Sequence, residues 1–430
     1  MVTMTDQPSG NQLARLLAIS LVIGVLGAIA ASLLLWVVDH GTELVFTQIP
    51  ESFGMESTPW WWAALLLLIS ASLVALTKKM PGATGAGPLS GFHFDDPLHI
   101  VPSVLLASLA TLIFGIALGP EAPLIVLGTS VGAIVARKAD PKTRQAIMML
   151  GGVAAISAVF GNPFITAFMI LEFAALGMLP ALLITPVLVA LAGSYLVQVG
   201  IWGIPGFGVH SLSVPGLPAY NSIQAGDLLT GALVAVIAGV VAVLARQGGT
   251  LFDRFARKRV TLALFAAAVI TALVLLVAMN GYSLPIDQIL FSGNSGMTTL
   301  IHETSIAAVI CILVGKAIAY SAALGSGFRG GPIFPATFLG VAVAVLVALM
   351  FPGDSVSALA AAGIAASAAA MLKLPATSAL IGMLLIVGAG PTVAPFAILG
   401  AAVGFMIRLT MDKKLGNDEQ PARVPQPTAN

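Results

Sequence analysis

The chain has 430 residues, of which 58% are hydrophobic and only 9% are charged, and its formal net charge is +1. A water-soluble globular protein of this length carries far more charge, so the composition indicates an integral membrane protein. The near-neutral balance gives no sign of a nucleic-acid partner or of a polybasic membrane-surface domain. The single cysteine, Cys311, lies in an apolar run and excludes both a disulfide framework and a cysteine metal site.

Apolar runs recur along the whole chain and predict membrane helices. They fall near residues 16–38, 60–77, 98–118, 121–136, 145–160, 163–178, 180–200, 227–245, 260–280, 301–324, 333–351, 355–372, 375–391 and 393–410. Their length and lack of alternating polarity exclude an outer-membrane barrel. Several are shorter than the roughly 20 residues of a straight crossing. We therefore expect an all-α polytopic membrane protein with broken helices.

The distribution of charge predicts the topology. The first run is too long for a signal-peptide core, so we expect it to remain as a span. The loop after it carries four acids (Asp39, Glu43, Glu51 and Glu56), whereas the second run ends at Lys78 and Lys79. Basic clusters at 137–144, 246–259 and 408–414 fit the side of Lys78 if an even number of crossings separates them. The positive-inside rule then predicts a multi-pass protein of the cell (inner) membrane, with cytoplasmic N- and C-termini.

Glu121 is the acid that the sequence singles out. It follows Pro120 at the start of an apolar run that ends about 16 residues later at Arg137, which is short for a crossing. Proline suits the first position of a helix, because its missing N–H costs no hydrogen bond there. We expect a helix that begins inside the membrane and directs its free N–H groups, with the positive end of its dipole, at an anion.

The stretch around Glu121 recurs in the second half of the chain. Gly119-Pro120-x-x-Pro123-x-x-x-Leu127-Gly128 reappears as Gly331-Pro332-x-x-Pro335-x-x-x-Leu339-Gly340, an offset of 212 residues. The same offset relates Gly151 to Gly363, Ala154 to Ala366, Pro163 to Pro375 and Ala167 to Ala379. These matches predict a duplication, and interrupted segments in matching places of two inverted repeats point to a substrate site at the membrane midplane.

The duplication divides one transmembrane domain, residues 1–430, into parts. We expect a first helical repeat at 1–205, a linker rich in Pro, Gly and Ser at 206–226, a second helical repeat at 227–410 and a polar cytoplasmic tail at 411–430. The linker joins the halves of one fold and does not separate independent domains. The two repeats are expected to be antiparallel, with their broken helices meeting at the anion site.

Three helix starts rich in Gly and Pro have the composition of an anion cradle, by which we mean free backbone N–H groups that surround an ion. They lie at 85–89, 119–128 and 325–335. Glycine allows close approach, and N–H groups replace the hydration shell without a fixed full charge. The alternative is a set of plain turns between helices. The predicted anion-binding residues are Gly85, Ala86, Gly87, Gly119, Glu121, Ala122, Gly331, Ile333 and Phe334.

Glu121 is predicted to act as a gate. At the N-terminus of a helix its carboxylate takes the place of an anion, so it competes with the transported ion until protonation releases it. The alternative is an acid exposed at the membrane interface. Glu172 is expected near an interface, with a role in a proton pathway as the competing interpretation. Lys316 either snorkels to the interface or neutralises part of a pore, and Arg329 adds positive field beside the second cradle.

Other patterns are rejected as chemical sites. Residues 325–330 fit GxGxxG and residues 128–132 fit GxSxG, but neither lies in the strand-to-helix setting that those motifs need. The polar stretch of His93, Asp95, Asp96 and His99 has no helical metal-binding spacing and is explained by a loop. We expect no enzyme activity, no catalytic residues, no metal and no cofactor, with chloride bound only as the transported ion.

At these residues the chain resembles the CLC family of chloride channels and chloride/proton antiporters. Residues 119–123 look like the family's GxEGP, residues 331–335 like GxFxP, and residues 85–89 like a degenerate GSGIP. The resemblance covers roughly residues 15–410. It implies a homodimer in the lipid bilayer, one ion pathway in each subunit, anions held at helix N-termini, and a gating glutamate that falls on Glu121.

The chain also departs from the family pattern. Ala86 stands where a chloride-binding serine is expected, Ile333 replaces a phenylalanine, and the last helices contain no tyrosine. The proton-relay glutamate of the antiporters falls on Phe173, which cannot carry protons. We therefore predict passive conduction of chloride or a related anion. Chloride/proton antiport through Glu121 and Glu172, and a secondary transporter for a cation or neutral solute, remain the alternatives.

Overall fold

A computed structural model describes residues 10–82, 86–201, 204–208, 213–386 and 388–414. Nearly all of its regular structure is helical, apart from one short antiparallel pair of strands. Seven helices in these ranges are long and apolar enough to cross a membrane. Six further apolar helices of 10 to 17 residues are too short to do so alone. The expected all-α polytopic fold with broken helices is confirmed.

The first repeat contains α1 (Gly10–Glu43), the π turn η1 (Leu44–Gln48), α2 (Ile49–Ser52), α3 (Trp60–Thr77), the 3₁₀ turns η2 (Pro88–Ser90) and η3 (Leu98–Ile100), α4 (Val101–Leu112), α5 (Glu121–Val135), α6 (Pro141–Phe160), α7 (Pro163–Ala175), η4 (Ala181–Leu183) and α8 (Ile184–Val199). Side chains define several of these starts. Asp140 caps α6 by accepting the N–H groups of Lys142 and Thr143, and Asn162 caps α7 by accepting that of Phe164.

The second repeat follows a connection that includes the strands β1 (Gly200–Ile201) and β2 (Ile204–Pro205). Its elements are α9 (Ala225–Tyr282), η5 (Ile286–Gln288), α10 (Gly296–Leu300), α11 (Ile306–Gly325), α12 (Ile333–Met350), α13 (Val356–Leu372), α14 (Pro375–Leu384), η6 (Pro391–Val393) and α15 (Ala394–Lys414). Arg259 interrupts α9 with non-helical dihedral angles (φ −147°, ψ 65°), so α9 is two helices in direct succession. This break matches the two apolar runs expected there.

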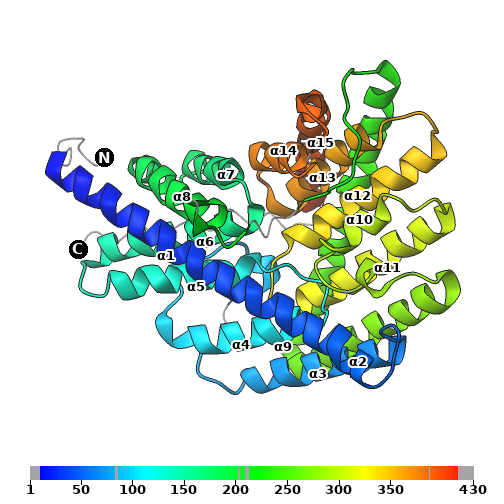
Figure 1. Cartoon of the computed structure of the whole chain (residues 1–430), viewed down its shortest axis with the longest axis horizontal. Coiled ribbons are helices and arrows are strands. Elements are labelled where there is room, and N and C mark those ends of the chain that lie inside the picture. Colours follow the sequence, from blue (N-terminus) through cyan, green and yellow to red (C-terminus); the bar gives the residue numbers. More distant parts are fainter. Residues whose placement is uncertain (1–9, 83–85, 202–203, 209–212, 387, 415–430) are drawn as a thin grey trace.

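The two repeats have the same arrangement of helices. The starts of α5 and α12, the ends of α6 and α13, and the starts of α7 and α14 all lie 212 residues apart. In each repeat a pair of glycines, Gly128 with Gly151 and Gly340 with Gly363, leaves no room for a side chain where two helices cross. Helices α5 to α8 gather on one side of the molecule and α11 to α15 on the other (Figure 1).

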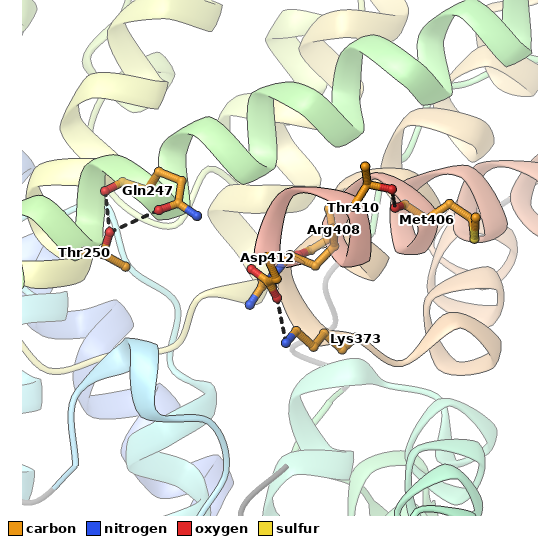
Figure 2. Close-up of polar contacts among 8 residues, drawn as sticks. Gln247, Thr250, Lys373, Met406, Arg408, Thr410 and Asp412 are labelled. Atoms are coloured by element: carbon orange, nitrogen blue, oxygen red, sulfur yellow. Dashed lines mark hydrogen bonds and ion pairs between the residues drawn. The ribbon is translucent and has the colours of Figure 1, made fainter. Parts of the chain in front are cut away.

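Two of the basic residues used to predict topology do not lie on the surface of the protein. Arg246 and Arg408 are buried, with 7% and 2% of their surface exposed. Figure 2 shows Asp412 of α15 between Arg408 of the same helix and Lys373 at the end of α13, at 2.7 and 2.6 Å. Arg408 also donates to the carbonyl of Ala370. These side chains join α13 to α15, so their charges serve helix packing.

The element boundaries differ slightly from those expected. Helix α9 begins at Ala225, so the last two residues of the expected linker, 206–226, are helical. Helix α15 continues to Lys414, four residues into the segment expected as a polar tail. Arg408 and Asp412, four residues apart on this last part of the helix, pair with each other and support it.

Candidate anion pathway

The central feature of the site is the meeting of two helix starts. Pro120 and Pro332 precede α5 and α12, and just before them Gly119 and Gly331 form an isolated antiparallel bridge. The N–H of each glycine donates to the carbonyl of the other, at 2.8 and 2.5 Å. The structure corrects the role expected of these glycines, because N–H groups engaged in this bridge are not available to an anion.

The glycines are needed here for space. A Cβ atom on either Gly119 or Gly331 would overlap the carboxylate of Glu121. Neither residue has a positive φ, so the requirement is steric and not conformational. The bridge therefore allows two chain segments and a buried carboxylate to occupy the same small volume.

Glu121 is fully buried and crosses from the first repeat to the second. Its Oε1 accepts the N–H groups of Ile333 and Phe334, at 2.8 and 3.0 Å. These are free N–H groups of the first turn of α12, where the helix dipole favours negative charge. Its Oε2 has no hydrogen-bond partner among the described residues. The carboxylate thus occupies the N-terminus of α12, the kind of position at which helices bind anions.

Two cavities are lined by residues that neighbour Glu121. The wide cavity, of about 830 Å³, reaches Pro120 and Phe334 and is also lined by the acids Asp39, Glu43 and Asp287. The narrow cavity, of about 30 Å³, reaches Ala122, Arg329 and Gly330. Glu121 lies in the chain between Pro120 and Ala122. The start of α5 therefore has the wide cavity at Pro120 and the narrow cavity at Ala122, with the buried Glu121 between these two residues.

The first predicted cradle lies at the narrow cavity. Ala86 and Gly87 line it, opposite Ala122 of α5, while Gly85 lies outside the described residues. Arg329, only 9% exposed, lines the same cavity. The structure thus brings together Ala86, Gly87 and Ala122 on one side of Glu121, and Ile333 and Phe334 at its carboxylate.

Lys316 lies behind the wide cavity and does not reach an interface. It is fully buried, and its Nζ donates to the carbonyls of Leu290 and Phe291, at 2.6 and 3.0 Å. The ammonium also lies 4.9 Å from the ring centre of Phe338, a cation–π contact. The expectation that Lys316 snorkels is wrong, because local carbonyls satisfy its charge inside the protein. Phe291 lines the wide cavity, so Lys316 fixes part of the cavity wall.

Glu172 caps a helix of the other repeat. Its Oε1 accepts the N–H of Ala376 at 2.8 Å, and its Oε2 accepts the N–H of Thr377 at 2.8 Å and the Thr377 hydroxyl. These groups belong to the first turn of α14. The neighbouring Phe173 packs edge-on against Phe92 and Phe94, with ring centres 6.1 and 6.4 Å away. The carboxylate of Glu172 is thus engaged by a helix terminus, beside an apolar aromatic cluster.

Comparison with known proteins identifies the family. Residues 86–409, most of the chain, match the family described as voltage gated chloride channel. The chain belongs to this family. As a member of the chloride channel family, it is an anion-transport protein of the membrane, which agrees with the helix N-termini and the buried carboxylate described above.

Individual relatives are distant but cover most of the chain. One, YfeO of Escherichia coli, whose name assigns it provisionally to ion transport, is 28% identical over 74% of this chain and 76% of its own length. A "Chloride/fluoride channel protein" of Pseudomonas syringae pv. tomato is 23% identical over 92% of this chain and 84% of its own length.

Solved structures of similar fold include a slow cyanobacterial Cl−/H+ antiporter, with a TM-score of 0.73 and 17% identity over 97% of this chain and 100% of that one. A CLC-type fluoride/proton antiporter gives a TM-score of 0.70 and 21% identity over 94% and 97% of the two chains. At these identities the likeness supports the shared chloride-channel fold.

Sequence reasoning missed several polar residues at the narrow cavity and before the second cradle. Ser108, His93 and Asp96 line the narrow cavity, and the hydroxyl of Tyr320 donates to the carbonyl of Pro332, directly before the second cradle, at 2.6 Å. The 212-residue offset was a usable signal for one of them, since it relates Ser108 to Tyr320. The sequence places His93 and Asp96 only in a polar loop, because nothing in their spacing indicates that the loop folds against α4 and α5.

Proposed function

We propose that the protein conducts chloride or a related small anion passively across the membrane, with Glu121 as the gate of the pathway. The observation that carries this proposal is the bonding of the Glu121 carboxylate to the N–H groups of Ile333 and Phe334, between two cavities. A carboxylate and a halide are stabilised by the same environment, namely N–H donors at a helix N-terminus. The bound carboxylate is therefore a tethered competitor of the ion.

Protonation of the Glu121 carboxylate is expected to open this gate. The neutral carboxyl group no longer gains from the helix dipole, and its hydrogen bonds to Ile333 and Phe334 lose their charge assistance. An incoming anion can then displace it and bind the same N–H groups. Because these groups carry only partial charges, they hold the ion weakly enough for it to leave again. Conduction is expected to rise as the pH falls.

Passive conduction is favoured over proton antiport by the surroundings of Phe173. The resemblance assigns the internal proton relay to this position, where an aromatic ring packs against Phe92 and Phe94. Glu172, the nearest alternative acid in sequence, is engaged in capping α14. The channel description of the Pseudomonas syringae relative points the same way and adds fluoride as a candidate ion.

The test is a flux assay in which purified protein in chloride-loaded liposomes is followed for chloride efflux and proton movement together. We expect chloride efflux without chloride-driven proton uptake. Proton uptake against its gradient would show antiport instead, and flux of a cation or a neutral solute without chloride would show the other alternative. Either result would overturn the passive reading.

The gate itself is tested by Glu121→Gln, which keeps the size of the side chain and removes its charge. Loss of charge assistance in two hydrogen bonds is worth about 1 to 2 kcal/mol, so chloride efflux at neutral pH should rise about tenfold. It should also lose its dependence on pH. The matched control is Glu51→Gln, on the exposed surface of α2, which should leave both properties unchanged. Wild-type flux and pH response in Glu121→Gln would rule out the gate.

We further propose that the protein is a homodimer in the cell (inner) membrane, with one pathway per subunit and both termini in the cytoplasm. Family membership supports the dimer, and the excess of lysines and arginines near the predicted inner ends supports the orientation. Light scattering of the detergent-solubilised protein tests the dimer. Accessibility of cysteines introduced at Lys79 and Glu51 tests the orientation, and only the latter should react with an impermeant reagent added outside cells.

A further inference from the structure

Helix α4 carries a buried hydroxyl group that is unlike its neighbours. Ser103 donates its hydroxyl proton to the carbonyl of Ile100 at 2.8 Å, and Thr111 donates to that of Ala107 at 2.7 Å. Ser108, between them, is fully buried, and its Oγ has no hydrogen-bond partner among the described residues. A buried polar group left without a partner is costly, so a ligand is expected where the hydroxyl points. Ser108 lines the narrow cavity.

The surroundings of this hydroxyl are suited to an anion. The guanidinium-bearing Arg329 lines the same cavity and is nine-tenths buried. Lys78, close by at the end of α3, has a pKa lowered to about 8, first by burial and then by the charge of Arg329. A cavity beside two cationic side chains in a partly dehydrated setting attracts negative charge.

Asp96 and His93 are the other titratable residues at the narrow cavity. Burial raises the pKa of the Asp96 carboxyl, with Asp95 acting in the same direction and His93 against it. A raised pKa means that the Asp96 carboxyl holds its negative charge less readily than an exposed aspartate does, so it opposes an anion here less strongly. Arg329 and Lys78 therefore set the sign of the local field.

The second repeat shows why space for a ligand exists at Ser108. The 212-residue offset relates Ser108 to Tyr320 of α11. The larger Tyr320 is fully buried, and its hydroxyl already donates to the carbonyl of Pro332, which precedes α12. Serine is too short to fill the corresponding volume or to reach a carbonyl before α5. The cavity next to Ser108, of about 30 Å³, has room for about two water-sized particles.

We propose that Ser108 is the hydroxyl ligand of the permeating anion in the narrow cavity, where its Oγ–H donates to a small halide that Arg329 attracts. This role compensates for Ala86, which lines the same cavity and has no hydroxyl group. The inference rests on the proposed function, since it adds a ligand to the pathway gated by Glu121. A single O–H donor in a small cavity favours a small halide over a large, weakly hydrated anion.

The test measures chloride binding to the full-length protein in detergent, by titration calorimetry and by thermal stabilisation in chloride relative to gluconate. Loss of a hydrogen bond to an ion should weaken chloride binding of Ser108→Ala about tenfold. The preference for chloride over thiocyanate should fall as well. Ser103→Ala, a change on the same helix that removes a hydroxyl already bonded to a carbonyl, should leave both unchanged.

Thermal stability distinguishes a role of Ser108 in ion binding from a structural role. Because the Ser108 hydroxyl has no hydrogen-bond partner in the described part of the chain, Ser108→Ala should melt no lower than the wild type in gluconate. Ser108→Thr, which keeps a hydroxyl, should retain more chloride affinity than Ser108→Ala. Unchanged chloride affinity and selectivity in Ser108→Ala would overturn this proposal while leaving the Glu121 gate intact. A wild-type protein that neither binds nor carries a halide would overturn both.

Discussion

The two repeats have equivalent helices but different side chains where those helices begin. Helix α5 starts with Glu121 and α12 with Ile333, 212 residues later. The acid of the first repeat does not serve its own helix, because it accepts the N–H groups at the start of α12. A duplicated backbone thus provides two helix N-termini near one point, and one side-chain difference makes one of them the occupied site.

A second carboxylate of the first repeat also caps a helix of the second repeat. Glu172 of α7 accepts the N–H groups of Ala376 and Thr377 at the start of α14, while its own counterpart is Leu384. In both cases a carboxylate of the first repeat caps a helix of the second, and the equivalent residue of the second repeat is apolar. The comparison teaches that these two carboxylate caps run only from the first repeat to the second, whereas the bridge between Gly119 and Gly331 is reciprocal.

The largest effect is expected from Gly331→Ala, because it removes the space that the carboxylate uses. The new Cβ atom would overlap Glu121 and expel its carboxylate from the cradle, or break the bridge to Gly119. Chloride flux should then lose its pH dependence, as in Glu121→Gln, and the flux assay measures this. Gly281→Ala is the control, since a Cβ there meets no atom within 4 Å. A folded Gly331→Ala protein with a wild-type pH response would contradict the assignment.

A smaller effect is expected from Glu172→Leu, which gives the first repeat the residue of the second. The change removes a charged cap from α14 and should destabilise the protein by about 2 kcal/mol. Thermal unfolding in detergent measures the loss, and Glu172→Gln should lose less because its amide oxygen still accepts. Chloride flux per folded protein should stay the same. A large change in chloride flux or in proton movement would contradict this prediction and indicate that Glu172 takes part in transport.

The smallest effects are expected at two equivalent helix ends, where the two repeats have different residues in the same left-handed backbone conformation. Gly161 ends α6 and Lys373 ends α13, both in the left-handed region (φ 63° and 59°). Gly161→Ala should cost about 1 kcal/mol, since this conformation disfavours a side chain. Lys373→Gly should change stability by less, because relief at the backbone is offset by loss of the ion pair with Asp412. Thermal unfolding distinguishes the two; equal losses would contradict the comparison.

The sequence was sufficient to predict the duplication and the place of Glu121 at the start of a short helix inside the protein. Both predictions depend on features that are visible in the amino-acid sequence. These are a fixed offset between Gly/Pro patterns and a charge at the start of an apolar helix. The helix starts at Glu121, Pro163, Ile333 and Pro375 follow directly, because proline and glycine act locally. For the same reason most boundaries of the apolar runs lie close to those of the helices.

The partners of the charged groups could not be predicted in the same way. The sequence does not say that Gly119 and Gly331 use their N–H groups on each other, that backbone carbonyls surround Lys316, or that Glu172 caps α14. The first and last of these contacts join residues more than 200 positions apart, and all are decided by how helices pack. An interior basic residue has the same local sequence whether it snorkels or is buried, so only the packed structure separates these possibilities.

The bridge between Gly119 and Gly331 also bears on ancestry. Because it joins equivalent residues by two matching hydrogen bonds, its local symmetry is that of a twofold dimer contact between identical chains. A chain of half this length could form the same contact with a second copy of itself. Two identical copies with an acid at this helix start would each place a carboxylate at the helix N-terminus of the other. After fusion of two such genes, one of the two acids can be replaced independently of the other.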